Sequence, residues 1–332
     1  MSNKISLIIP SISKSFSMND LLTNICLWSF LPSEIIIVNT SGTKIIIGSH
    51  LKIKFDKMNI ILNIINKKNL YPGAARNLGI LNSQFNYILF LDMNTVPYSK
   101  DWLKNNFQFL LKNKLDGLCG QTYYMAETYK EKLIRASTYG KGLLRTIPGS
   151  IFSKKIIDKV GKFNSITRAG EDTEWLTKLN KDNFKIKDSI VPIYYKGLYN
   201  VSYLGITKKW YRNYSFSANL PHLAPQKYLY LFFLFFFFLF VVFNWNSSNL
   251  NWGTGIQLYI PHITKIFISG SALLYLIIRG IYVPLVKKIK LRYLLPYNIF
   301  LVTIFSFILD SAKLLAFSLS LSLKWIAPNR KK

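Results

Sequence analysis

The stretch that decides the fold is YILFLDMNTVP, from Tyr87 to Pro97. Residues 87–91 form a mostly apolar run that is too short for a helix and has the length of a buried strand. Asp92 follows directly at the carboxyl end of that strand, and Asn94 stands two residues later. Ligands of open α/β sheets bind just past the carboxyl ends of the strands. The stretch therefore predicts either oxygen ligands for a hard cation and substrate phosphates, or an ordinary turn before Pro97.

The sequence before this stretch alternates between apolar runs of strand length and helical segments. Pro72 suits the first turn of a helix, and Gly73 lets the backbone approach a ligand. Alternation of this kind predicts a mostly parallel sheet covered by helices, which is an α/β fold. The predicted strands are 5–10, 34–38 and 60–65, and the predicted helices are 19–30 and 72–82.

The pattern continues after the acidic loop with less regular spacing. Residues 146–152 are typical of a turn that enters a strand, and Gly161 closes a short helix that starts at about residue 156. Helices are predicted over 100–112 and 126–138, and a strand over 117–124.

A second chemically promising stretch is GEDTEWLTKL, from Gly170 to Leu179. A helix is expected to start after Gly170, and its face formed by residues 172, 175, 176 and 179 is predicted to be buried. Asp172 at the head of this helix, beside Trp175, is well placed to face a pocket, where the helix dipole favours its ionised form. The alternative interpretations are that Asp172 is only an N-cap and that Trp175 is a core residue.

The composition indicates a basic protein with a large apolar fraction. The chain has 332 residues, 43 Lys and Arg against 15 Asp and Glu, and a formal net charge of +28. Membranes and phosphorylated substrates are better partners for this charge than nucleic acid, because the basic residues accompany long apolar segments and form no compact basic module. Cys26 and Cys119 are predicted to be reduced core residues of a cytosolic compartment, and no secretory signal pattern is found at residues 1–10.

The C-terminal third has the pattern of a membrane region, 228–332, with spans predicted at about 228–244 and 266–286. Residues 205–227 are basic with scattered aromatic residues, which predicts an amphipathic juxtamembrane segment; a solvated surface helix is the alternative. The loop 244–262 has no Lys or Arg, whereas a basic cluster follows residue 286. The positive-inside rule then places that cluster and the N-terminal domain in the cytoplasm.

The last apolar segment, 295–323, carries a polar face formed by Thr303, Ser306, Asp310 and Lys313. A charged pair within a membrane is costly unless it faces protein or water. The segment is therefore interpreted as interfacial or re-entrant, with a third span as the alternative. The basic tail after it also favours the cytoplasm.

Four ordered pieces of the sequence carry a resemblance to a known family. They are LIIP followed by EIIIVNTSG, then YPGAARNLGI, YILFLDMNTVP and GEDTEW, within about residues 4–217. In this order and spacing they resemble a membrane-anchored family 2 glycosyltransferase with the GT-A fold. The resemblance implies a Rossmann-like domain over residues 1–204, followed by C-terminal membrane helices.

The resemblance also implies roles for individual residues. Pro10, Ser11 and Asn39 would hold the nucleotide of a nucleotide-sugar donor. The stretch with Gly73, Arg76 and Asn77 would approach the diphosphate, which agrees with the affinity of helix N-termini and Arg for phosphate. Asp92 and Asn94 would bind Mg²⁺ or Mn²⁺, and Asp92 would also contact the donor. Asp172 would be the catalytic base, with Glu171 and Trp175 beside it in the substrate site.

The implied reaction is transfer of a sugar, with inversion, to a hydroxyl of a membrane-associated acceptor such as a lipid-linked saccharide or glycolipid, as in cell envelope polysaccharide synthesis. Asn39 and Asn94 stand where the family usually has Asp, so the metal is expected to bind weakly. Two alternatives follow: a sugar transferase acting on polyprenyl phosphate, and a non-catalytic membrane protein of the same fold.

Overall fold

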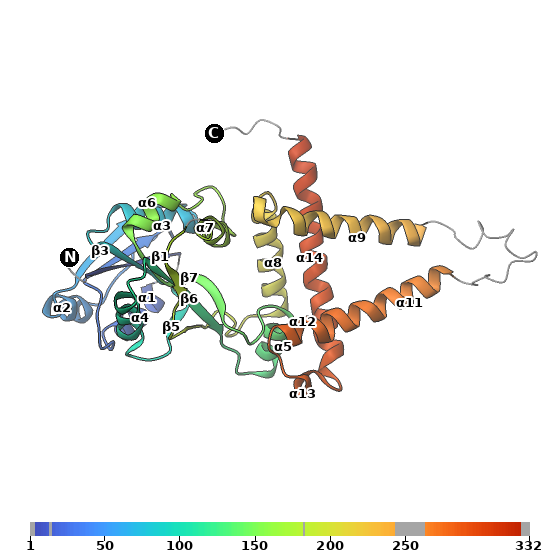
Figure 1. Ribbon diagram of the computed structural model, residues 1–332, viewed down its shortest axis with the longest axis horizontal. Coiled ribbons are helices and arrows are strands. Elements are labelled where there is room, and N and C mark those ends of the chain that lie inside the picture. The colour runs from blue at the N-terminus through green and yellow to red at the C-terminus, as the bar shows by residue number, and fades with distance from the viewer. Residues whose placement is uncertain (1–3, 13–14, 182, 243–262, 327–332) are drawn as a thin grey trace, which may run out of the picture. The chain divides into compact units, whose positions relative to one another are not determined.

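The computed structural model describes residues 4–12, 15–181, 183–242 and 263–326 (Figure 1). The chain divides into two compact units. The first comprises residues 1–126 and 142–199, and the second comprises residues 127–141 and 200–332. Each unit has its own architecture.

The first unit is built on a sheet whose parallel half was predictable from the apolar runs. Strands β1 (Ile5–Ser11), β2 (Glu34–Asn39), β3 (Ile61–Asn66) and β4 (Tyr87–Phe90) lie in the order β3-β2-β1-β4, and each neighbouring pair is parallel. Parallel strands that are covered on both faces read as continuous hydrophobic runs, which is the pattern of β1, β2 and β4.

The second half of the sheet makes it mixed. Strand β7 (Leu144–Ser153) is antiparallel to β4 and to β6 (Gly117–Tyr124). Strand β9 (Ile193–Tyr195) is parallel to β6 and antiparallel to β5 (Thr95–Pro97). Over the described residues the sheet has nine strands in the order β3-β2-β1-β4-β7-β6-β9-β5, and β8 (Ile186–Asp188) pairs with β6.

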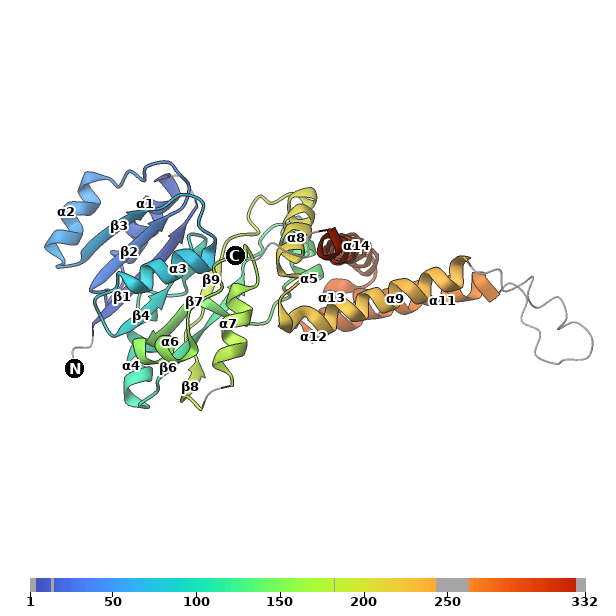
Figure 2. The ribbon, with the colours of Figure 1, turned by 90° about the horizontal axis from the view of Figure 1, so that it is seen from above.

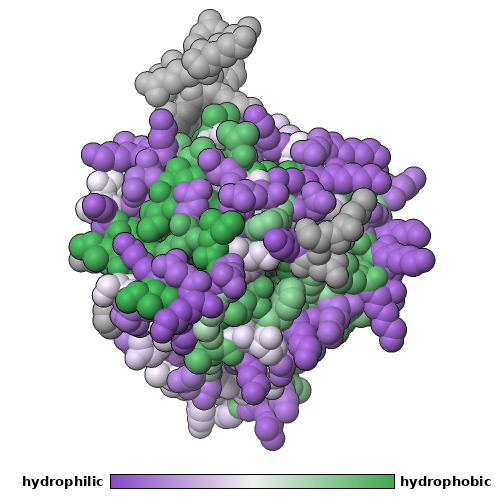
Figure 3. Space-filling view, turned by 90° about the vertical axis from the view of Figure 1, so that its left-hand side faces the viewer, coloured by the Kyte–Doolittle hydropathy of each residue, from purple (hydrophilic) through white to green (hydrophobic). Residues whose placement is uncertain are grey.

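Helices cover both faces of the sheet, and alternate residues of a strand face different cores (Figure 2). In β1, Leu7 and Ile9 join one core, and Ile8 joins the other. The first core includes side chains of α1 (Ser15–Ile25), α2 (Ser49–Lys57) and α4 (Trp102–Lys112). The second includes side chains of α3 (Pro72–Leu81), α6 (Lys154–Val160) and α7 (Glu171–Leu179). Hydrophilic residues occupy much of the face shown in Figure 3, with hydrophobic residues between them.

Helix α2 is one of the elements that the sequence pattern did not predict. Its sequence, SHLKIKFDK, buries only Leu51 and Phe55, one helical turn apart. Two apolar contacts in a lysine-rich segment give too weak a period to be recognised. The helix supplies the crossover that parallel strands β2 and β3 need.

The second unit is helical. Helix α8 (Tyr203–Ser217) lies alongside α14 (Asn298–Ile326), and Tyr203 packs edge-on against Phe305 (Figure 1). The other helical elements among the described residues of this unit are α5 (Tyr129–Ser137), η1 (Pro221–Leu223), α9 (Ala224–Val242), α11 (Ile263–Tyr275), the π-helical η3 (Leu276–Tyr282), α12 (Val283–Val286) and α13 (Leu291–Leu294).

The two units do not follow the predicted bounds 1–204, 205–227 and 228–332, because the second unit includes residues 127–141 and resumes at residue 200. Residues 127–141 belong to the second unit because Leu133 and Ala136 of α5 pack with Leu294 and Val302. A boundary drawn from the linear sequence could not include a segment that is contributed from within the first unit. The first unit ends at residue 199.

Three helical stretches among the described residues are long and apolar enough to cross a membrane: Pro221–Leu239, Lys265–Val286 and Asn298–Ser320. They correspond to the two predicted spans and to the ambiguous third segment. The third forms one continuous helix, α14, so a re-entrant turn within it is ruled out. The predicted uncharged loop 244–262 and the basic residues after 326 lie outside the described residues.

The polar face of α14 is turned toward protein. Asp310 accepts hydrogen bonds from Tyr230 (2.9 Å) and Tyr275 (2.8 Å), and its Oδ2 lies 2.7 Å from Arg279 Nε. Asp310 is therefore paired with Arg279, whereas Lys313 donates to the Tyr230 hydroxyl at 3.3 Å. Such mutual pairing is what an ion in an apolar segment requires.

Candidate functional site

The carboxyl ends of the parallel strands bring four predicted or neighbouring positions to one edge of the sheet. Ser11 is in register with Asn39, and Asn39 is in register with Asn66. Asp92 follows β4, which pairs with β1. This edge is where open α/β sheets bind their ligands. Asn66 was missed in the sequence, although it follows the apolar run of β3 just as Asn39 follows that of β2.

Asn39 organises the loop after β2 through all of its amide atoms. Its Nδ2 donates to Asn66 Oδ1 at 2.7 Å and to the Thr43 carbonyl at 2.6 Å. Its Oδ1 accepts from the Ser41 hydroxyl at 2.7 Å. The side chain is 2% exposed. In this arrangement Asn39 shapes the end of the strand and does not present a free amide to a nucleotide.

The first predicted nucleotide loop has one buried and one accessible member. Ser11 is fully buried, and its carbonyl accepts from the Thr40 backbone N–H at 2.7 Å. Pro10 is partly exposed and is in register with Val38. The carboxyl end of β1 is thus joined to the start of the loop after β2 by a backbone hydrogen bond, and Pro10 is the more accessible of the two predicted positions.

Asp92 stands in a short turn that is fixed by Thr95. Thr95 Oγ1 donates to the Asp92 carbonyl at 2.6 Å, and the Thr95 backbone N–H donates to it at 3.0 Å. These bonds involve the backbone carbonyl of Asp92, and its side chain is 38% exposed. Asn94 is exposed, and its carbonyl accepts from the Lys196 backbone N–H at 2.9 Å. The chain then enters β5, so the predicted turn continues as a strand.

Arg76 of α3 joins the two acidic stretches that the sequence singled out. Its Nη1 donates to Glu171 Oε1 at 2.8 Å, and its Nη2 donates to Asp92 Oδ1 at 3.3 Å. The side chain is nearly buried, and it also lies 5.7 Å from the centre of the Phe163 ring. Although burial lowers the pKa of Arg76, the negative charges of Asp92, Glu171 and Asp172 raise it further, so the guanidinium stays charged. Arg76 was predicted to meet the diphosphate, but its terminal nitrogens are directed to the two acids.

Helix α7 follows its N-cap residue Gly170, whose φ of +86° is in the left-handed region that favours glycine. The acid that follows, Glu171, is 5% exposed. Burial raises the pKa of Glu171 to about 7, against the lowering effect of Arg76, and the nearby charge of Asp172 adds to the increase. A desolvated carboxyl beside a second acid is a common feature of catalytic sites.

Asp172 is the more accessible acid of the pair. Its Oδ1 accepts from the backbone N–H of Thr173 at 2.8 Å, and the residue is of intermediate exposure. The prediction that Asp172 lies on the buried face of α7 is therefore wrong in detail, because Glu171 is the acid that points into the protein. The N-cap position belongs to Gly170, so the N-cap alternative for Asp172 is also not met. Asp172 therefore keeps an accessible carboxylate.

Gly73 and Asn77 of α3 have structural contacts that explain their residue types. A Cβ on Gly73 would lie 2.1 Å from the Asn164 carbonyl oxygen, so only glycine fits there. The Asn77 amide donates to the Phe163 carbonyl at 2.8 Å and accepts from the Phe163 backbone N–H at 2.9 Å. Both residues hold the loop before α7 against α3. The sequence had predicted that they approach a diphosphate.

Trp175 is a core residue, which corrects its predicted place in the substrate site. It is 1% exposed, stacks on Phe163 with ring centroids 4.9 Å apart, and also packs against Phe152. Its indole N–H donates to the Gly161 carbonyl at 2.8 Å. The helical spacing correctly predicted that residues 175, 176 and 179 are buried, but it wrongly included Asp172 and could not distinguish a core from a pocket.

The donor set near Asp92 fits a weakly held hard cation. One carboxylate oxygen and one amide oxygen are the ligand classes that Mg²⁺ and Mn²⁺ accept, and both side chains are accessible. No group of three or more His, Cys, Asp or Glu that could hold a metal ion is found in the part of the chain that the structure describes. A cation at Asp92 and Asn94 would therefore need most of its ligands from a bound diphosphate and water.

Comparison with known proteins finds a family whose model matches about half of the chain, mostly within the first unit. Residues 6–168 match the model of the family described as glycosyl transferase family 2. An uncharacterized glycosyltransferase of Rickettsia felis is 30% identical over 133 residues, which are 40% of this chain and 21% of that protein. An uncharacterized glycosyltransferase of Rickettsia conorii is 31% identical over 133 residues, which are again 40% of this chain and 21% of that protein. The chain thus spans about a fifth of the length of these relatives.

Similar solved structures are distant in sequence. Residues 1–349 of TarS from S. aureus match with a TM-score of 0.45 and 16% identity over 65% of this chain and 66% of that chain. A mannosyltransferase from Pyrobaculum calidifontis, solved with GDP-Man and Mn²⁺, matches with a TM-score of 0.45 and 13% identity over 67% of this chain and 64% of that chain.

Proposed function

From a chain that belongs to glycosyl transferase family 2 through its first unit, we propose an enzyme that moves a sugar, with inversion, from a nucleoside diphosphate to an acceptor hydroxyl. The acceptor is proposed to be membrane-associated, either a lipid-linked saccharide or a glycolipid. The observation that carries the proposal is that Arg76 connects Asp92 with the head of α7, where Asp172 stands. Acids from separate parts of the sequence are thereby gathered at one place.

The reaction is a single displacement. The acceptor oxygen attacks the anomeric carbon while the bond from that carbon to the diphosphate oxygen breaks, and Asp172 takes the hydroxyl proton. A positioned base of this kind contributes roughly 10²- to 10⁴-fold to the rate. Asp172 suits the role because its carboxylate is accessible and its Oδ1 is oriented by the Thr173 backbone N–H at 2.8 Å.

Arg76 and Glu171 are assigned positioning roles. Arg76 is 3% exposed, so it acts on the reaction through the acids that it orients and not as a free phosphate-binding cation. Glu171 fixes Arg76 at the start of α7 through the 2.8 Å contact. Together they set the relation between the Asp92 loop and Asp172, which a displacement reaction requires to be accurate.

A divalent cation bound by Asp92 and Asn94 would neutralise charge on the leaving diphosphate. Its affinity is expected to be low in the absence of donor, because Asn94 contributes a neutral oxygen. Pro10, near the carboxyl end of β1, is the position that we expect to contact the nucleotide, since it is accessible and lies at the carboxyl edge of the sheet. Donor and cation should therefore bind together.

Attachment to a membrane follows from the helices of the second unit. In Figures 1 and 2, α9 and α11 extend in the same direction, and α14 runs across them beside α8. We infer that α9 and the helix Lys265–Val286 span the membrane and that α8 and α14 lie along its surface. The basic residues 287–292 follow the second span, so the positive-inside rule places this end, and the catalytic unit, in the cytoplasm.

The experiment that tests this proposal is a donor panel. The purified full chain in detergent is heated with nucleotide sugars, with and without Mn²⁺, and its melting temperature is recorded. At least one donor should raise the melting temperature, and more so with Mn²⁺, because a ligand that binds only the folded state stabilises it. The variant Asp92→Asn should reduce this shift. If no donor shifts the melting temperature, the non-catalytic alternative is correct.

A further inference from the structure

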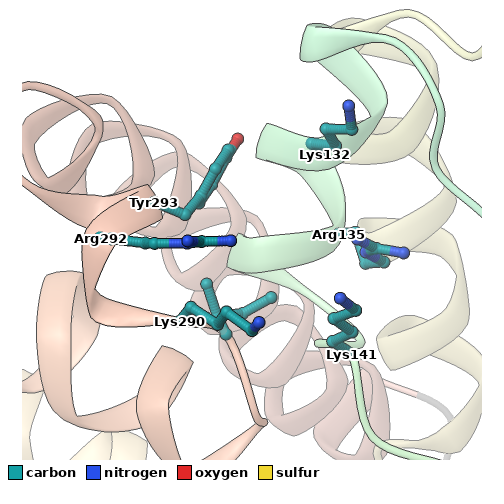
Figure 4. Close-up of a pocket in the computed structure, with 7 residues that line it drawn as sticks. Lys132, Arg135, Lys141, Lys290, Arg292 and Tyr293 are labelled. Atoms are coloured by element: carbon teal, nitrogen blue, oxygen red, sulfur yellow. The ribbon is translucent and has the colours of Figure 1, made fainter.

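A cavity of about 260 Å³ in the second unit is lined by basic residues (Figure 4). Two sides contribute to it. Lys290 and Arg292 extend from the segment around α13, toward Arg135 of α5 and the nearby Lys141. The fifth basic residue is Lys132. The cavity lies wholly within the second unit and contains none of the residues of the candidate active site.

The two sides of the cavity are fastened by their backbones. Gly140 has a φ of +74°, and a Cβ there would lie 2.3 Å from Lys287 Cβ, so glycine is needed for the approach. The Lys141 backbone N–H donates to the Lys287 carbonyl at 2.8 Å, and Lys287 Nζ donates to the Thr138 carbonyl. The basic side chains therefore converge because of built contacts and not by the chance approach of two loops.

The other end of the cavity wall is fixed in a similar way. The Tyr129 hydroxyl donates to Asn298 Oδ1, and Asn298 Nδ2 donates to the Tyr293 carbonyl at 2.6 Å. Behind this wall is a small apolar core to which Ile289 belongs, and Ile289 also lines the cavity. The cavity is thus a fixed part of the second unit.

The chemistry of the lining selects an anion. Five cationic side chains line the cavity, and no acidic residue is among the described residues that line it. Arg135 is 8% exposed, so its guanidinium is held in a largely desolvated place where anions bind strongly. The Tyr293 hydroxyl is buried and has no hydrogen-bond partner among the described residues, which provides a further donor.

The size and position of the cavity favour a lipid headgroup. Its volume is below the roughly 300–1,000 Å³ of pockets that enclose a drug-sized molecule, so it suits a phosphate-sized group and not a nucleotide sugar. Its residues 289–293 lie between the apolar helices Lys265–Val286 and Asn298–Ser320. Residues directly after a membrane span are found at headgroup level. Several cations suit a phosphate monoester or diphosphate better than a singly charged diester.

We propose that this cavity binds the phosphate monoester or diphosphate headgroup of a membrane lipid. The inference rests on the proposed membrane attachment but not on sugar transfer. The lipid would hold the end of the second span and α5 together at the membrane surface. Its fatty chains would remain outside the cavity, along the exposed apolar side chains of the neighbouring helices.

The test is calorimetric titration of the full chain in non-ionic detergent with dioctanoyl phosphatidic acid. Phosphatidylcholine with the same chains and inorganic pyrophosphate are titrated in parallel. The variants are Lys290→Ala and Arg292→Ala, both at exposed positions that should fold normally. Lys288→Ala is the matched control, since Lys288 is an exposed cation of the same segment that does not line the cavity.

The proposal predicts saturable binding of phosphatidic acid that each cavity variant weakens about tenfold, as expected for loss of one charge-assisted hydrogen bond. The Lys288→Ala protein should bind within about twofold of the unaltered chain. Three results would overturn the proposal: no saturable binding, an equal loss in Lys288→Ala, or pyrophosphate binding as tightly as the lipid, which would indicate a site for a soluble anion. Because the readout is binding alone, an inactive but lipid-binding chain would refute only the proposed catalysis.

Discussion

Arg76 and Glu171 form a buried ion pair, with Arg76 Nη1 and Glu171 Oε1 2.8 Å apart although the residues are 95 positions apart in the sequence. The pair connects α3 with the first residue of α7. Through its second nitrogen Arg76 also reaches Asp92 at 3.3 Å. The arrangement of the candidate active site therefore depends on one guanidinium.

Replacing Arg76 by Ala should destabilise the first unit by about 3–5 kcal/mol, because it leaves the buried Glu171 carboxyl without its partner. The effect is measured by denaturant unfolding of the full chain in detergent. Arg145→Ala is the control, since Arg145 pairs with Asp188 at 3.1 Å on the surface, where an ion pair contributes about 0–1 kcal/mol. Similar losses for both variants would show that the Arg76 pair has no special structural weight.

The raised pKa of Glu171 predicts a pH-dependent stability. Below the ordinary pKa of 4.5 the carboxyl is protonated in both the folded and unfolded states, and its burial carries no penalty for charge. As the pH rises through about 7, the unfolded state ionises first, so the free energy of unfolding falls by on the order of 3 kcal/mol. Unfolding midpoints measured across this range should show the decline, and the variant Glu171→Gln should lack it. A decline that persists in Glu171→Gln would assign it to another group.

Asn94→Asp should strengthen metal binding. The substitution adds a negative oxygen ligand at an exposed position, so a lower Mn²⁺ concentration should give half of the donor-dependent increase in melting temperature. Asn113→Asp, at the exposed C-terminal end of α4, changes the charge equally and should have no such effect. An unchanged Mn²⁺ requirement in Asn94→Asp would place the metal elsewhere.

Trp175→Phe tests the core assignment of the tryptophan. The variant keeps an aromatic ring beside Phe163 but loses the 2.8 Å hydrogen bond to the Gly161 carbonyl. We expect a loss of about 1 kcal/mol in the free energy of unfolding. Kinetic constants for donor and acceptor should remain unchanged. A large rise in the KM for acceptor, with stability unaffected, would restore Trp175 to the substrate site.

The parallel half of the sheet could be predicted because its strands are apolar runs bounded by polar turn residues. Asp92 and Asn39 could be placed at the carboxyl edge for the same reason, since strand order is not needed to know which end of a strand a residue follows. Strand β9 and helix α2 could not be predicted, because β9 has three residues and α2 buries only two side chains. Their positions are decided by tertiary pairing.

The site was harder to predict than the fold because side-chain partners come from distant segments. Helical periodicity placed Asp172 and Trp175 on one face, but the buried acid is Glu171, one residue before Asp172. Nothing in the local sequence indicates that Arg76 selects Glu171 and Asp92 as partners. The basic cavity could not be predicted either, because Arg135 and Arg292 are far apart in the chain and line one cavity only through the packing of α5.

The most direct test of the central claim is turnover by the variant Asp172→Asn with the donor that the panel identifies. Release of nucleoside diphosphate is measured with native membranes supplying the acceptor, and donor affinity is measured separately. Asp158→Asn, an exposed acid of α6, is the control. The account predicts a turnover lower by about 10²- to 10⁴-fold in Asp172→Asn with donor affinity within about twofold. Full turnover by Asp172→Asn would contradict it and would favour a phosphate acceptor, which needs no base.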